Sequence, residues 1–215
     1  MKTTAFERFA GLCAMLAGIA GFLYSVSFVV LARSAPAASV LLIPLFLTLS
    51  GLLAAGALVG LYQRVQPTEP GFALLALGLG LAGALGAAVH GGYDLSNAIN
   101  PPLDNAAAAA NLPSQIDPRG MLTFGVAGLA LFFFAWLIGQ GGLSRGLSLL
   151  GYVTAALLVI IYLARLIVLQ PTNPVLLVPV LLVGFILNPV WYLWLGRTLW
   201  QEASQSVMAK RAVRG

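Results

Sequence analysis

The amino-acid sequence predicts an all-α, polytopic membrane protein with six transmembrane helices. Only 8% of its 215 residues are charged, whereas 60% are hydrophobic. Soluble domains carry about 25% charged residues. So few charges cannot cover a surface that faces water, and we expect lipid to solvate most of the protein. The sequence also contains six apolar runs that approach or exceed the roughly 20 residues needed to cross a bilayer as a helix.

The six runs are continuous rather than alternating, which favours helices over a membrane β-barrel. They are expected at residues 9–31, 38–62, 71–90, 121–138, 147–169 and 175–195. We interpret residues 1–200 as one transmembrane domain, with an outer loop at 91–120, and residues 201–215 as a basic tail.

The positions of the basic residues predict the orientation. With six spans, both termini lie on one side of the membrane, and that side carries eight of the eleven Lys and Arg residues. The other side carries Arg33 and Arg119, and Arg165 lies within the fifth run. Because cytoplasmic loops are enriched in basic residues, both termini are expected in the cytoplasm. Topology therefore explains the net charge of +5, and no nucleic-acid partner is expected.

Small residues dominate the third run. Two rows recur every fourth residue, namely Gly78, Ala82, Gly86 and Ala76, Gly80, Ala84, Ala88. Such rows let helix backbones approach closely. We expect the third helix at the centre of the bundle, and we favour packing within the chain over a dimer face. The bulkier fourth and sixth runs, with aromatic clusters at 132–136 and 191–194, should lie further out.

The outer loop is predicted to contain short helical segments. Residues 94–99 could continue the third helix until Asn100-Pro101-Pro102 stops it. Residues 104–112 form either a short capped helix or a flexible stretch. The capping residues favour the helix, which would cover the outer side between the third and fourth spans. Asp117 and Pro118 then suit the start of the fourth span, because helix N-termini favour acidic residues and proline.

Ionisable residues at membrane depth are functional hypotheses by default. The candidate polar cluster comprises His90, Tyr93, Asp94, Asn97, Asp117 and Arg165. His90 and Asp94 lie one helical turn apart, but two ligands do not make a metal site, so no metal or other cofactor is predicted. A hydrogen bond from His90 to a carboxylate or carbonyl is the simpler role, and single ligation of a haem or pigment by His90 is the alternative. Arg165 should reach the outer headgroups, pair with Asp94 or, failing that, pair with Asp117.

Proline residues are expected to bend two of the helices, formed by the second and the sixth run. They are Pro44, Pro179 and the Asn188-Pro189 pair in the sixth run. Kinked helices occur in transporters and also in ordinary bundles. In the inner half of the bundle, Thr48, Ser50 and Asn188 are the main candidates for polar lining.

The sequence contains no catalytic motif that we recognise, such as a nucleophile elbow, a zinc-protease helix or a phosphate loop. The segment Glu7–Leu12, the ending Leu61–Arg64 and the six-span plan resemble uncharacterised bacterial six-helix membrane proteins, the domain-of-unknown-function 4386-like group. This resemblance implies a bacterial plasma (inner) membrane, and it supplies neither an activity nor site residues.

Two functional hypotheses follow from these patterns. The first is a non-enzymatic scaffold or accessory subunit, with the lipid bilayer and other membrane subunits as its partners. The alternative is a small-solute transporter or channel with an outer vestibule around His90, Asp94 and Arg165. An intramembrane enzyme is the weakest reading.

Overall fold

The computed structural model describes residues 4–100, 116–168 and 173–212, and every element in these ranges is helical. Six of the helical stretches are long and apolar enough to cross a membrane, so the predicted six-span, all-α fold is confirmed. These spans are Ala5–Ser34, Pro36–Val65, Pro70–Ile99, Pro118–Gln140, Arg145–Ile167 and Pro174–Gln201. Each predicted run lies largely within one of them.

Three spans are single α-helices, and three are interrupted by π-helical turns. The single helices are α3 (Pro36–Val65), α4 (Pro70–Ile99) and α7 (Arg145–Ile167). The first span comprises α1 (Thr4–Val26), the π segment η1 (Ser27–Leu31) and α2 (Ala32–Ser34). The fourth comprises the 3₁₀ turn η2 (Pro118–Gly120), the π segment η3 (Met121–Val126) and α6 (Ala127–Gln140). The sixth comprises α8 (Pro174–Leu182), the π segment η4 (Val183–Leu187) and α9 (Asn188–Ala212).

The helix ends follow from local sequence. Pro36, Pro70 and Pro174 occupy the first turns of their helices, where a missing N–H costs nothing. Asn173 caps α8, because its side-chain oxygen accepts a hydrogen bond from the backbone N–H of Val175 at 3.0 Å. These signals explain why the connections between spans are short wherever the structure describes them.

The helix α4 is longer than the third apolar run. It continues past Gly91 and Gly92 to Ile99 and ends at Asn100, as the proline that follows requires. The predicted continuation of the third helix through residues 94–99, as far as Asn100, is therefore confirmed. The short helix expected at 104–112 lies outside the described residues. At the other end of the chain, α9 extends through Ala212 into the basic tail.

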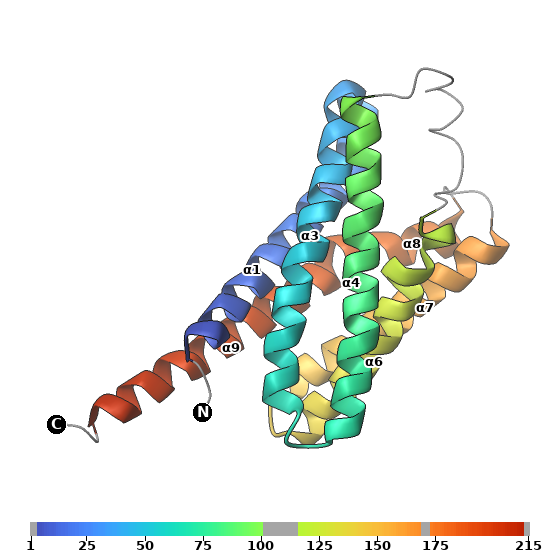
Figure 1. The fold of residues 1–215 in the computed structure, drawn as a ribbon. Helices are drawn as coiled ribbons and strands as arrows, with labels where there is room; N and C mark the ends of the chain where they lie inside the picture. The colour runs from blue at the N-terminus through green and yellow to red at the C-terminus, as the bar shows by residue number, and fades with distance from the viewer. Residues whose placement is uncertain (1–3, 101–115, 169–172, 213–215) are drawn as a thin grey trace.

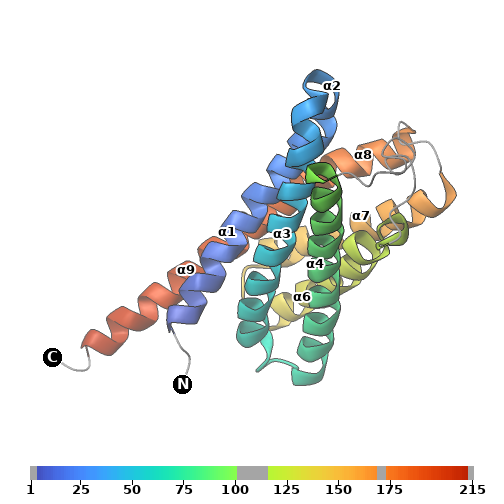
Figure 2. The ribbon, with the colours of Figure 1, turned by 45° about the horizontal axis from the view of Figure 1, so that its top comes forward.

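The six spans form a ring (Figures 1 and 2). The antiparallel pair α3–α4 stands upright in Figure 1, with α1 and α9 side by side across it and the α6–α7 pair inclined on the other flank. Successive neighbours in contact are α9 and α1, α1 and α3, α3 and α4, α4 and α6, and α6 and α7. The ring closes where α7 contacts α8, η4 and α9. The expectation of a central third helix was wrong, because α4 is one wall of the ring, between α3 and α6.

Small residues on α4 bring its two neighbours close. A Cβ atom added at Gly83 would lie 2.8 Å from the Cβ atom of Ala127 on α6. One added at Gly91 would lie 2.7 Å from the carbonyl oxygen of Pro44 on α3. The row Ala76, Gly80, Ala84 and Ala88 is buried, as expected for packing within the chain. Gly78 and Ala82, from the other row, are exposed.

Two of the large aromatic residues also depart from the prediction. Phe134 and Trp191 are fully buried, whereas Phe132 and Trp194 face outward. Phe134 packs toward Gly80, whose added Cβ atom would lie 3.4 Å from the ring. The small side chains of α4 leave volume inside the ring, and the ring of Phe134 from the neighbouring helix α6 fills part of it.

Candidate ligand-binding cavity

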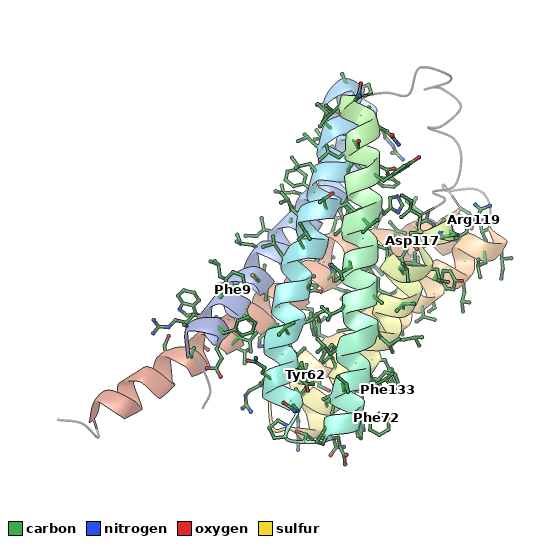
Figure 3. The ribbon with its side chains drawn as sticks, viewed as in Figure 1. Phe9, Tyr62, Phe72, Asp117, Arg119 and Phe133 are labelled. Carbon is green, nitrogen blue, oxygen red and sulfur yellow. The ribbon has the colours of Figure 1, made fainter. Side chains whose placement is uncertain are left out.

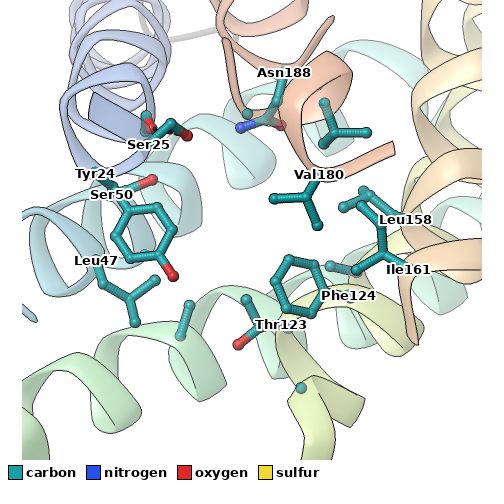
Figure 4. A pocket seen from close by; sticks show the side chains of 18 of the residues that line it. Tyr24, Ser25, Leu47, Ser50, Thr123, Phe124, Leu158, Ile161, Val180 and Asn188 are labelled. Atoms are coloured by element: carbon teal, nitrogen blue, oxygen red, sulfur yellow. Dashed lines mark hydrogen bonds between the residues drawn. The ribbon is translucent and has the colours of Figure 1, made fainter. Parts of the chain in front are cut away.

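A cavity of about 530 Å³ lies inside the ring, lined by residues from all six spans. Figure 4 shows side chains of α1, α3, α7, α8 and η3 that surround it. This volume falls within the range of about 300–1,000 Å³ that small-molecule sites occupy. For convenience, the end of the bundle that holds Arg33, Asn100 and Asp117 is called the outer end, following the predicted orientation.

The walls of the cavity are mainly apolar. They include Leu47, Leu131, Leu158, Ile161, Leu177 and Val180. Toward the inner end, Leu58, Phe134 and Trp191 line it, and the indole N–H of Trp191 has no hydrogen-bond partner among the described residues. The buried side chains Leu61, Leu137, Ile138, Leu147 and Leu195 fill the space beyond. The described residues therefore close the inner half of the bundle with hydrocarbon.

A band of uncharged polar groups crosses the cavity between these walls. Figure 4 labels Tyr24 and Ser25 on α1, Ser50 on α3 and Asn188 on α9. The hydroxyl of Ser25 donates to the carbonyl oxygen of Gly21 at 3.1 Å, which satisfies it within its own helix. Ser50 and Asn188 thus line the middle of the cavity rather than the inner half of the bundle, where polar lining was expected. Thr48 is not among the lining residues, and its hydroxyl donates to the carbonyl oxygen of Pro44 at 2.8 Å.

Charged residues line the outer part of the cavity. They are Arg33, His90, Asp94, Asp117, Arg119 and Arg165, and we call this set the charged mouth. The Nε2 atom of His90 lies 3.2 Å from a carboxylate oxygen of Asp94, one turn along α4. This is the simpler role expected for His90. No third His, Cys, Asp or Glu joins the pair within the described ranges.

Asp117 is the buried carboxylate at the start of the fourth span. Its oxygens accept hydrogen bonds from the backbone N–H groups of Leu122 at 2.8 Å and Thr123 at 3.1 Å. The hydroxyl of Thr123 donates a third bond at 2.6 Å. Because the first N–H groups of a helix lack partners within it, Asp117 stabilises this helix end. Figure 3 labels it at the entrance to the fourth span.

The turn after Asp117 is tightly constrained. Arg119 and Gly120 both adopt left-handed backbone conformations, with φ of 58° and 78°. At Gly120 an added Cβ atom would run into the ring of Phe124 and would lie 3.1 Å from a guanidinium nitrogen of Arg165. Glycine at position 120 therefore lets the turn, Phe124 and Arg165 pack together.

Arg165 is half-buried near the outer end of α7. Its guanidinium carbon lies 5.3 Å from the centre of the Phe124 ring, a distance typical of a cation–π contact. Its electrostatic neighbours are Tyr24, Asp117 and Arg119. Within the described residues Arg165 forms no ion pair with the predicted partner Asp94, whose carboxylate contacts His90 instead. The fallback partner, Asp117, is a neighbour of Arg165 across the mouth.

The structure thus brings four of the six candidate residues to one cavity: His90, Asp94, Asp117 and Arg165. Tyr93 is exposed, Asn97 is partly exposed, and neither lines the cavity. Tyr24, which interacts electrostatically with both Asp94 and Arg165, was missed. Its phenol within the first apolar run was the available signal. Arg33 and Arg119 had been considered only as topology markers.

The predicted helix irregularities have different outcomes. Pro44 lies inside the continuous helix α3, and Pro179 lies inside α8. The π segment η4 immediately precedes Asn188 and Pro189. Residues of all three π segments line the cavity, among them Phe28 in η1, Phe124 in η3 and Gly184 in η4. Such segments occur frequently at functional sites, which agrees with the position of the cavity.

Comparison with protein-family models, curated proteins and solved structures finds no match to this chain.

Proposed function

We propose that this protein binds a small amphipathic molecule inside the membrane, with the apolar part of the molecule in the cavity and its polar end at the charged mouth. The observation that carries the proposal is the gradient along the cavity. Charged residues occupy its outer part, hydroxyl and amide groups its middle, and hydrocarbon its inner end. Pockets with apolar walls and a few convergent polar groups are the usual form of a small-molecule site.

This proposal develops the vestibule hypothesis but omits a path through the protein. A hydrated path would need polar groups toward the inner end of the bundle, whereas the fully buried Leu61, Leu137 and Leu195 lie beyond the inner end of the cavity. Binding followed by release to the same side or into lipid requires no such path. A receptor, a carrier and an enzyme acting on the bound molecule all share this first step.

Binding can be measured by the fluorescence of Trp191 in lipid nanodiscs. Trp136, Trp194 and Trp200 are replaced by Phe, which leaves the fully buried Trp191 at the inner end of the cavity as the reporter. A brominated hexadecanol quenches nearby indole by contact, and we expect saturable quenching. Quenching that rises linearly with the probe, without saturation, would contradict the proposal.

A matched pair of variants on α8 provides the control. The side chain of Val180 points into the cavity in Figure 4, whereas Val178 is 52% exposed on the outer surface of the helix. Val180→Phe should fill part of the cavity and reduce quenching several-fold, and Val178→Phe should leave it unchanged. Equal effects of the two substitutions would mean that the probe reaches Trp191 from the lipid.

We further propose a bacterial plasma membrane, which rests on the resemblance noted in the sequence. We also propose that both termini lie in the cytoplasm, which the distribution of basic residues supports. Single cysteines at Ser114 and Ser204, in a Cys13→Ala background, should be labelled from opposite sides of intact cells. Labelling of both from one side would contradict the orientation.

The accessory-subunit hypothesis makes a separate prediction. Under it, other membrane subunits should co-purify with the protein in mild detergent. Recovery of a monodisperse monomer with no such protein would contradict it, whatever the cavity binds.

A further inference from the structure

We propose that the charged mouth selects an anionic headgroup, a carboxylate or phosphate that Arg165 binds, so that the preferred ligand is a single-chain anionic amphiphile. The inference rests on the proposed function, because it assigns the chemistry of the molecule that occupies the same cavity. Its basis is the balance of charges around the mouth and their hydrogen-bond partners.

Both aspartates of the mouth already have partners. Asp117 accepts three hydrogen bonds at the start of the fourth span. Asp94 contacts His90 at 3.2 Å. Against these two carboxylates stand three arginines, Arg33, Arg119 and Arg165. The mouth is therefore net positive when His90 is neutral, and no carboxylate among the described residues forms an ion pair with Arg165.

A half-buried guanidinium at membrane depth is costly unless an anion or water accompanies it. Arg165 lies against the Phe124 ring, which covers one face of the guanidinium. The second cation nearby, Arg119, adds to the positive potential at Arg165, and the phenol of Tyr24 is also a neighbour. An oxyanion between these groups would accept paired hydrogen bonds from the guanidinium and relieve the repulsion between the two arginines.

The apolar walls indicate that the anion belongs to an amphiphile. A small inorganic anion at Arg165 would leave empty the part of the cavity that Leu58, Phe134 and Trp191 line. A single alkyl chain attached to the anion would fill that part and remove its surface from water. Headgroup recognition and chain burial would then act together in one ligand.

The test is a charge series at constant chain length. Hexadecanoate, hexadecyl phosphate, hexadecanol and hexadecyltrimethylammonium compete with the brominated probe for the single-Trp protein in zwitterionic nanodiscs. The two anions should bind at least tenfold more tightly than the alcohol, and the cation should bind most weakly. Inorganic phosphate alone should not displace the probe. Displacement by inorganic phosphate at the concentration of the alkyl phosphate would contradict the assignment to an amphiphile.

Substitutions on α7 test whether Arg165 is the cation that binds the anionic headgroup. Arg165→Gln should lower the affinity for hexadecanoate to that for hexadecanol, while Arg165→Lys retains part of the preference. The control is Arg145→Gln, at the exposed opposite end of α7, which should change neither affinity. A preference that survives in Arg165→Gln would overturn the role of Arg165.

The outcomes separate the two proposals. Equal affinity of the wild-type protein for anion and alcohol would refute the anionic preference and leave the cavity as a binding site. Absence of saturable quenching by the brominated probe, together with no displacement by any of the four competitors, would refute the proposed function itself. The charge series on the wild-type protein tests the preference for an anionic headgroup even if Arg165→Gln fails to fold.

Discussion

Substitution of Gly83 by Ala tests the closest contact between α4 and α6. The new Cβ atom would lie 2.8 Å from the Cβ atom of Ala127, 3.0 Å from its Cα atom and 3.1 Å from its nitrogen. Non-bonded carbon atoms normally remain about 3.5–4.0 Å apart. Because two of the three neighbouring atoms are backbone, no side-chain rotation can relieve the contact, and the helices must separate.

The size of the effect follows from comparison with Gly78 on the same helix. No atom lies within 4 Å of a Cβ atom added at Gly78. Both substitutions gain the same helix propensity, roughly 1 kcal/mol, and this gain cancels in the comparison. Overpacking in a well-packed interior costs about 1–3 kcal/mol, so Gly83→Ala should be less stable than Gly78→Ala by that amount.

Cys13 provides the measurement. It is the only cysteine in the chain and is buried against Gly56, so a fluorogenic maleimide should react with it mainly after unfolding. For a chain of this size, each kcal/mol lowers the melting temperature by about 2–4 °C. Equal melting temperatures for the Gly83 and Gly78 variants would show that α4 and α6 do not approach as described.

Three further outcomes can be checked with the same assay. Asp117→Asn should lower the free energy of unfolding by about 1–3 kcal/mol, because the new amide nitrogen would face donors that now bond to a carboxylate oxygen. The control is Asp94→Asn at the half-exposed mouth, and a melting temperature of Asp117→Asn no lower than that of the control would refute this role. Gly120→Ala should lower the free energy of unfolding by at least about 1–2 kcal/mol, because alanine is strained in the left-handed backbone conformation. The new Cβ atom would also clash with the ring of Phe124 and lower the stability further. An unchanged melting temperature would contradict the geometry of this turn. In the folded protein Cys13 should react with maleimide far more slowly than a cysteine introduced, in a Cys13→Ala background, at the exposed Gln66 in the turn after α3, and equal rates would contradict the burial of Cys13.

The sequence was sufficient to predict the features that depend on length and local pattern. The six spans follow from apolar runs, the end of α4 follows from Asn100 and the proline after it, and the role of Asp117 follows from the preference for acids at helix N-termini. The contact between His90 and Asp94 follows from their spacing of one helical turn. Each of these depends on residues close together in the chain.

The cavity could not be predicted in the same way. In a membrane protein, side chains that face lipid and side chains that face the core are both apolar, so periodicity does not reveal which face of a helix is inward. Trp191 and Trp194 are equally apolar in sequence, yet only Trp191 is buried. The error over Arg165 has the same origin, because its distance from Asp94 depends on how far apart the ring holds α4 and α7.

The π segments also determine how the chain tolerates changes in length. A π turn holds one residue more than an α turn between hydrogen-bonded neighbours, while the flanking helices keep their ordinary register. Deletion of one residue within Val183–Leu187 would therefore convert the π segment into ordinary α-helix. The helices α8 and α9 would keep their orientation relative to each other, and the wall that this segment gives the cavity would become narrower. The same deletion within α9 would instead rotate everything after it by about 100°. The walls of this cavity are thus the places where the spans can lose a residue without reorienting the rest of the bundle.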